Sequence, residues 1–226
     1  MLSQTISMLT DPASWTGSGG FIARIVEHLQ ISFIALALSL LIALPLGLVI
    51  GHTGRGRGLI VGTSGALRAI PSLGLLTALA LIIPGGVANA MIPSLVVLVV
   101  LGIPPILAGT YSGIDAIPAP IKDGSTAIGY SPLQVLGRVE IPLAVPQIID
   151  GIRSSLLQII STATICAYLG IGGLGRYLID GLATRDYPEV LSGAVIVIAI
   201  VLFFEILLAS LGKLVAPKGS RESSHN

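Results

Sequence analysis

The residues with the clearest spacing lie in a polar stretch near the middle of the chain, from Tyr111 to Asp150. Asp123-Gly124-Ser125 is followed after three residues by Gly129, and after nine more by Val139-Glu140-Ile141-Pro142. Long apolar segments flank the stretch on both sides. A bare connection between two membrane helices needs only a few residues. A long stretch with its own helix signals therefore favours a docking surface for a partner in the water.

Patterns typical of catalysis are weak in this chain. Gly62-Thr63-Ser64-Gly65 resembles the serine motif of intramembrane proteases, but such an enzyme needs a histidine base on another span. His28 and His52 fall at opposite ends of one apolar segment, and His225 lies near the C-terminus. Three scattered histidines and one cysteine, Cys166, make no metal-ligand cluster. We therefore expect neither an enzyme nor a metal site.

Phosphate binding is not expected either. The segment from Gly170 to Gly175 holds four glycines in six residues. No Gly-x-x-x-x-Gly-Lys-[Ser/Thr] sequence accompanies it, so the chain carries no P-loop. A tight turn is the better interpretation, and we expect the chain to bind no cofactor of its own.

The polar stretch contains signals for two short helices. Asp123 can cap a helix start, and Ser125 to Ile128 can form about one turn. Gly129 permits a left-handed bend. Ser131-Pro132 predicts a second helix start, with Ser as N-cap and Pro at the first helical position. We expect a short helix across the membrane face, closed by Pro142 and Pro146.

The composition predicts an integral membrane protein. Of 226 residues, 53% are hydrophobic and 10% charged, whereas soluble domains carry about 25% charged residues. The net charge of +1 gives no support to nucleic-acid binding. About 20 apolar residues are needed for a span. Five segments qualify, and the second is interrupted by Arg68 and Pro71; they run approximately over residues 25–50, 59–83, 90–111, 152–170 and 190–211.

Basic residues favour one orientation, because loops rich in Lys and Arg stay in the cytoplasm. With the C-terminus inside, the cytoplasmic side holds Arg55, Arg57, Lys122, Arg138, Arg153, Lys213, Lys218 and Arg221. The outside holds Arg24, Arg176 and Arg185. We therefore expect an all-α fold with an extracytoplasmic segment over residues 1–24 and a transmembrane domain over 25–213. The cytoplasmic loop covers about 112–150, and a cytoplasmic tail covers 214–226.

Polar residues within the apolar segments have two interpretations each. Arg68 marks either the cytoplasmic end of a shorter span or a position near a pathway. Ser161, Thr162 and Thr164 either line a polar path or bond back to the preceding helical turn. Glu205 has no obvious partner in the sequence, so a proton relay is not predicted.

The spacing of the polar stretch resembles the EAA motif of type I ABC importer permeases. The family form is Glu-Ala-Ala, three residues, Gly, nine residues, Ile-x-Leu-Pro. Gly129, Val139, Ile141 and Pro142 keep its spacing and character, whereas Asp123-Gly124-Ser125 departs from Glu-Ala-Ala. Further segments resemble the osmoprotectant branch, which includes permeases for glycine betaine, carnitine, choline and proline betaine. They are Arg68-Ala-Ile-Pro-Ser72, Gly151-Ile-Arg153, Ser161-Thr-Ala-Thr164, Gly170-Ile-Gly-Gly-Leu-Gly175 and Asp186 before Leu191-Ser-Gly-Ala194.

The resemblance implies a transport subunit in the bacterial cytoplasmic membrane. Its partners would be a second permease, two cytosolic ATP-binding subunits that hold ATP and Mg²⁺, and an extracytoplasmic substrate-binding protein. The residues implied in coupling are Asp123, Gly124, Ser125, Gly129, Ser131, Ile141 and Pro142. Candidates for the translocation path are Arg68, Ser72, Ser161, Thr162 and Thr164.

Two alternatives stay open at this point. One is a permease for methionine or another amino acid, because those permeases share the five-span plan. The other is a self-contained channel or secondary carrier, although no convincing internal repeat is present. Aromatic residues make up only 4% of the chain. A tight aromatic cage for a quaternary ammonium group is therefore not expected within the spans.

Overall fold

The computed structural model describes residues 1–56, 58 and 70–215, and all regular structure within these ranges is helical. Twelve helical segments follow one another along the described chain. They are α1 (Leu2–Thr10), α2 (Pro12–Trp15), α3 (Phe21–Thr53), α5 (Ser72–Ile82), α6 (Met91–Asp115), α7 (Ala119–Ala127), α8 (Pro132–Val135), the π-helical turn η1 (Leu136–Glu140), α9 (Ile141–Thr162), the 3₁₀ segment η2 (Ala163–Leu169), α10 (Gly175–Thr184) and α11 (Tyr187–Val215).

Four helical stretches in the described ranges are long and apolar enough to cross a membrane. They cover Phe21–Thr53, Met91–Asp115, Pro132–Leu169 and Tyr187–Ser210. Residues 59–69 of the second expected span lie outside the described residues; the described remainder contains α5, an apolar helix of 11 residues.

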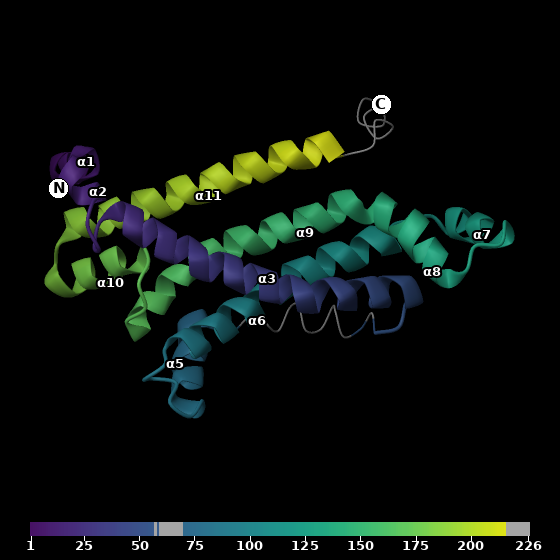
Figure 1. The fold of residues 1–226 in the computed structure, drawn as a ribbon, viewed down its shortest axis with the longest axis horizontal. Helices are drawn as coiled ribbons and strands as arrows, with labels where there is room; N and C mark the ends of the chain where they lie inside the picture. The colour runs from purple at the N-terminus through teal and green to yellow at the C-terminus, as the bar shows by residue number, and fades with distance from the viewer. Residues whose placement is uncertain (57, 59–69, 216–226) are drawn as a thin grey trace.

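The core lies where α3, α6 and α9 pack side by side along their length, with α11 running beside them (Figure 1). Small residues let these backbones approach closely. A Cβ at Gly47 would lie 2.7 Å from Thr110 Cβ, and one at Gly109 would lie 2.8 Å from Gly151 Cα. Ser155 Oγ donates across the same interface to the Gly102 carbonyl at 2.8 Å. A Cβ at Gly51 would lie 2.9 Å from Ile114 Cβ, so Gly47 and Gly51 both serve packing within the bundle.

The helices around the polar stretch extend further than expected. α6 continues to Asp115, four residues past the expected end of its span. α7 begins at Ala119 behind Pro118, so the prediction that Asp123 caps a helix is wrong. The physical reason is that Pro120 lies in the first turn of α7, where its missing N–H costs nothing.

Pro142 and Pro146 do not close the polar segment, contrary to expectation. Helical structure runs from Pro132 through η1 into α9, and both prolines lie within α9. Pro142 sits in the first turn of α9, where a proline is tolerated. Local π adjustment, as in η1, accommodates a helix whose regular hydrogen-bond ladder is interrupted.

The bundle has two distinct ends (Figure 1). α1, α2 and α10 gather at the end where α3 begins. α7 and α8 lie at the opposite end, where α3 and α6 finish and α9 begins. The polar stretch therefore forms one tip of the molecule.

Candidate coupling surface

The tip is built by α7, a bend at Gly129 and α8. Asp123, Gly124 and Ser125 lie inside α7, and Ser125 Oγ donates to the Ile121 carbonyl at 2.8 Å. Gly129 follows α7 with φ +95°, a backbone conformation that glycine adopts without strain. The bend predicted at Gly129 is therefore confirmed.

α8 starts as the sequence predicted. Ser131 is its N-cap and Pro132 its first residue. The backbone N–H of Ser131 donates to Gln134 Oε1 at 2.9 Å, as in a capping box. This local bonding fixes the direction in which the chain leaves the bend and enters α9.

The predicted coupling residues divide into two groups. Asp123, Gly124, Ser125, Gly129 and Ser131 lie at the tip, on α7 and the bend that follows it. Ile141 and Pro142 lie beyond η1, in the first turn of α9. The structure thus separates the Gly-containing half of the motif from its Ile-Pro half by α8 and η1.

Apolar side chains at the tip are open to the surroundings. Ile128 is 76% exposed and Leu133 is 79% exposed, on either side of the bend. None of the α7 residues is buried. An exposed apolar surface of this kind, rimmed by polar residues, is typical of a site that another protein covers.

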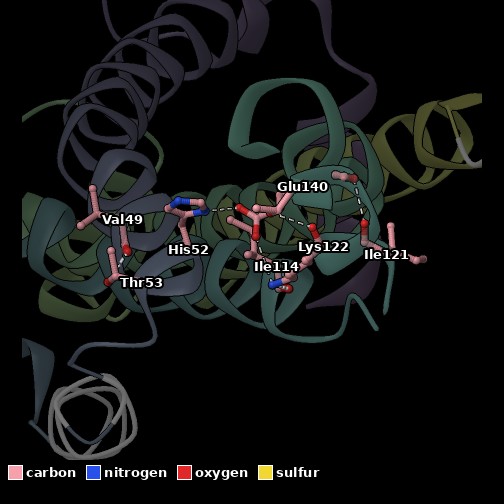
Figure 2. A network of polar contacts seen from close by, with 9 residues as sticks. Val49, His52, Thr53, Ile114, Ile121, Lys122 and Glu140 are labelled. Carbon is pink, nitrogen blue, oxygen red and sulfur yellow. Dashed lines mark hydrogen bonds and ion pairs between the residues drawn. The ribbon is translucent and has the colours of Figure 1, made fainter. Parts of the chain in front are cut away.

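Charged side chains lie beneath this surface, in the arrangement shown in Figure 2. Glu140, at the end of η1, is 1% exposed. Its Oε2 lies 2.5 Å from His52 Nδ1, and its Oε1 lies 3.2 Å from Lys122 Nζ. Lys122 Nζ also donates to the Ile114 carbonyl at 3.0 Å. This network, called the Glu140 network below, joins α3, α6, α7 and η1.

Sequence reasoning missed the Glu140 network. Glu140 occupies the variable position between Val139 and Ile141, and His52 was weighed only as a protease base. One signal was available: Glu140 stands directly before an apolar helix, where a carboxylate needs a partner. The sequence could not indicate which of the neighbouring cations supplies it.

The structure describes four of the five candidate path residues. Arg68 lies outside the described residues. Ser72 is the first residue of α5 and is half-buried. Ser161 Oγ donates to the Leu157 carbonyl at 2.8 Å, and Thr164 Oγ1 donates to the Ser161 carbonyl at 2.9 Å. Thr162 ends α9, directly before the 3₁₀ segment.

Ser161 and Thr164 nevertheless face an open groove. It has a volume of about 370 Å³, and α10 and α11 form its other walls with Leu178, Val197, Val201 and other apolar residues. Both hydroxyls donate to carbonyls of the preceding helical turn, as one of the two interpretations expected. They also line the groove, as the other expected. The groove is mostly apolar apart from these two groups.

Glu205 does have a partner, which corrects the expectation from the sequence. Arg153 Nε donates to Glu205 Oε2 at 2.9 Å, and Arg153 Nη2 contacts Glu205 Oε1. Arg153 lies well inside α9, because this helix begins at Ile141 and not near residue 152 as expected for the fourth span. The two-point contact ties α9 to α11 and leaves Glu205 paired.

The glycines from Gly170 to Gly175 form the predicted turn. Gly170 and Gly173 have φ +82° and +98°. The backbone N–H of Gly173 donates to Glu27 Oε2 at 2.7 Å. Together they turn the chain from η2 into α10, against the start of α3.

Comparison with known proteins gives this arrangement a family. Residues 43–221 match the family described as "Binding-protein-dependent transport system inner membrane component". The chain belongs to this family. It is a permease subunit with several membrane-spanning helices, and it is not itself an enzyme.

Characterised relatives cover nearly the whole permease chain. It is 35% identical over 205 residues to the choline transport system permease protein OpuBB of Bacillus subtilis (strain 168), covering 90% of this chain and 92% of the relative. Identity and coverage are the same for the glycine betaine/carnitine/choline permease protein OpuCB of that organism. The osmoprotectant import permease protein OsmW of Salmonella typhimurium is 30% identical over 96% of this chain and 99% of its own.

Solved structures show the same fold. An inward-facing structure of the MetNI methionine ABC transporter superposes with a TM-score of 0.74 at 20% identity, covering 87% of this permease and 96% of that chain. A crystal structure of an amino acid ABC transporter with histidines gives a TM-score of 0.69 at 18% identity, covering 85% and 92%. At these identities the likeness concerns the fold alone.

Proposed function

We propose that this permease subunit moves osmoprotectants such as glycine betaine, choline or carnitine across the cytoplasmic membrane. The observation that carries the proposal is the 35% identity, over nine-tenths of the chain, to permeases named for those solutes. The methionine and amino acid transporters share the fold at no more than 20% identity, so they give little support to an amino acid as the solute.

The working assembly contains two permease subunits, two cytosolic ATP-binding subunits and an extracytoplasmic binding protein. Five spans are too few to enclose a path alone, so a second permease subunit, of this chain or a related one, pairs with it. ATP and Mg²⁺ are held by the partner subunits. Support for docking at the tip comes from Ile128 and Leu133, whose exposed apolar side chains offer a surface for a partner.

The orientation places the tip in the cytoplasm, with the N-terminus outside and the C-terminus inside. The second of the five proposed spans has α5 as its described helix. Figure 1 shows α7 and α10 at opposite ends of the bundle. Lys122 belongs to α7, Arg138 to η1, and Arg55 follows α3, whereas Arg24 lies in the first turn of α3, Arg176 in α10, and Arg185 directly after α10. α11 runs toward the α7 end of the bundle, and the sequence after it contains the basic residues Lys218 and Arg221.

Transport proceeds by alternating access. Closure of the ATP-bound subunits draws the two tips together, and the helices joined to them switch from inward-facing to outward-facing. A loaded binding protein then releases its solute, and hydrolysis resets the assembly. Docking uses Asp123, Gly124, Ser125, Gly129 and Ser131, while Ile141 and Pro142 form the joint to α9.

The path itself binds its solute weakly. Its candidate residues remain Arg68, Ser72, Ser161, Thr162 and Thr164. Aromatic residues make up only 4% of the chain, and some of them meet one another edge to face: Trp15 and Phe21 at 5.2 Å, and Phe33 and Phe204 at 5.6 Å. Capture of a quaternary ammonium group therefore belongs to the separate binding protein.

The test is uptake of radiolabelled glycine betaine by cells or membrane vesicles at high osmolarity, with and without this chain. We expect uptake to require both the chain and ATP. Absence of betaine uptake, with ATP-binding subunits still co-purifying, would turn the search to choline, carnitine and then amino acids. Uptake without ATP would contradict the importer.

A further inference from the structure

Glu140 is a buried carboxylate with no role in the transport cycle as described so far. Its position in the motif is the variable one, yet its side chain is 1% exposed and both oxygens have partners (Figure 2). A buried carboxylate without partners is very unfavourable, so its surroundings must supply charge or hydrogen bonds. His52 from α3 and Lys122 from α7 supply them.

Lys122 connects α7 to two helices at once. Its ammonium group lies 3.2 Å from Glu140 Oε1 and donates to the Ile114 carbonyl at 3.0 Å. Ile114 lies in the last turn of α6, and its carbonyl also accepts the backbone N–H of Ile117 at 3.3 Å. A cation at a helix C-terminus is also favourable electrostatically. Lys122 therefore fastens α7 to the end of α6 and to the start of α9.

Few other contacts hold α7 in place. Apolar burial contributes little, because no α7 residue is buried. The hydroxyls of Ser125 and Thr126 bond to carbonyls within α7 itself. Charge-assisted hydrogen bonds are stronger than neutral ones and are directional. The orientation of α7 relative to the bundle thus depends strongly on Lys122 and on the carboxylate that it meets.

We propose that Glu140 and Lys122 are positioning residues for coupling: they make α7 move together with the ends of α3, α6 and α9. This inference rests on the proposed importer function. Without the network, a partner subunit would displace α7 alone, and the spans would follow incompletely. ATP hydrolysis would continue while solute transport fell behind.

The primary variant is Lys122→Met, tested in the complete transporter with its partner subunits. Methionine keeps an unbranched apolar stem of similar length and removes the ammonium group, while the His52–Glu140 contact remains. We expect normal co-purification of the ATP-binding subunits and about a tenfold fall in solute moved per ATP hydrolysed, the factor that corresponds to one charge-assisted bond. Lys122→Arg should recover most of the ratio, because it keeps the charge.

Amide hydrogen exchange gives a readout that does not depend on the solute. In Lys122→Met, exchange should rise in α7 and stay unchanged in α6 and α9. Arg55→Met is the matched control: it removes a positive charge at the same end, from an exposed side chain outside the Glu140 network. The control should leave both the exchange of α7 and the transport ratio unchanged.

Two results would overturn the inference. One is a Lys122→Met transporter with a wild-type transport ratio and wild-type α7 exchange. The other is exchange that rises equally through α3, α6 and α9, which would indicate a general loss of stability. Glu140→Gln should uncouple as Lys122→Met does; if it fails to accumulate, Lys122→Met alone decides. A wild-type transporter that moved no betaine would contradict the proposed substrate, while the exchange comparison would still test the fastening of α7.

Discussion

The two ends of the helix bundle differ in where their carboxylates lie. At the α7 end, apolar side chains such as Ile128 and Leu133 are exposed, and the charged Glu140 is buried beneath them. At the α10 end, Phe21 and Leu174 are fully buried. The α10 end leaves its ion pairs, such as Arg176–Asp180 at 2.9 Å, partly exposed. The α7 end thus has a buried carboxylate beneath exposed apolar side chains, whereas the charges of the Arg176–Asp180 pair at the α10 end stay partly in contact with the surroundings.

Glycines at the two ends include some that a neighbouring atom approaches closely and some that none approaches. A Cβ at Gly124 or Gly129 would meet no atom within 4 Å, so these glycines are not required by packing. At the α10 end, a Cβ at Gly172 would lie 2.2 Å from Glu27 Oε2, and one at Gly175 would lie 2.0 Å from the Thr164 carbonyl oxygen. Glycine serves backbone conformation at Gly129 and close packing at Gly172 and Gly175, so substitutions should affect function at the first position and stability at the other two.

The largest effect is expected for Gly175→Ala. The added methyl group would overlap the backbone of Thr164 and approach Ala167 Cβ at 2.9 Å, and neither can move without shifting η2. Overpacking of this kind costs about 3 kcal/mol or more when backbone must shift. We expect little protein in the membrane and a lowered unfolding temperature in detergent. Gly19→Ala, at the same end but with no atom within 4 Å of its Cβ, is the control and should behave as wild type.

Gly129→Val comes next, with an effect on transport and not on accumulation. Valine at φ +95° is strained by about 1–3 kcal/mol even though the site has room. The bend between α7 and α8 would open, so uptake should be lost while the protein stays in the membrane. Gly129→Asn is the matched control, because Asn tolerates positive φ better, and it should retain part of the uptake. Normal uptake by Gly129→Val would remove the bend from the coupling mechanism.

The sequence predicted those features that depend on neighbouring residues alone. Local signals were read correctly where they act locally: Gly129 bends the chain, Ser131-Pro132 starts a helix, and the glycines from Gly170 form a turn. The all-helical class followed from composition. The ends of helices were harder to predict. Pro142 is expected to end the short helix, but it lies inside a continuous helical stretch.

Contacts between distant residues could not be predicted. Glu140 meets His52 across 88 positions, and Arg153 meets Glu205 across 52. In the sequence, each partner taken alone is a charged residue either in a loop or within an apolar segment. Only the packing of α3 against η1, and of α9 against α11, brings the pairs together. Neither pair has a spacing that a local pattern would reveal.

Removing the Arg153–Glu205 contact, which joins α9 to α11, should have a smaller effect on stability. Arg153→Leu leaves the Glu205 carboxylate without its two-point partner and should lower the unfolding temperature by a few degrees. Glu205→Leu combined with Arg153→Leu should recover part of that loss, because an unpaired charge no longer remains. Thermal unfolding of the two single variants and the double variant measures the coupling. Equal and additive losses would mean that the contact does not join α9 to α11.

The smallest effect is expected for Gly124→Ala. Its effect on uptake shows whether a partner contacts the backbone of α7 at this position. Gly124 is helical and exposed, with no atom within 4 Å of its Cβ, so alanine should stabilise α7 by about 0.5–1 kcal/mol. Amide exchange of α7 should slow slightly, and uptake should stay near wild type. A clear loss of uptake together with slower exchange would show that a partner approaches the backbone at Gly124 too closely for a methyl group. In that case the docking face of α7 includes Gly124, and the glycine at the α7 end would serve close packing after all, against a second protein instead of within the bundle.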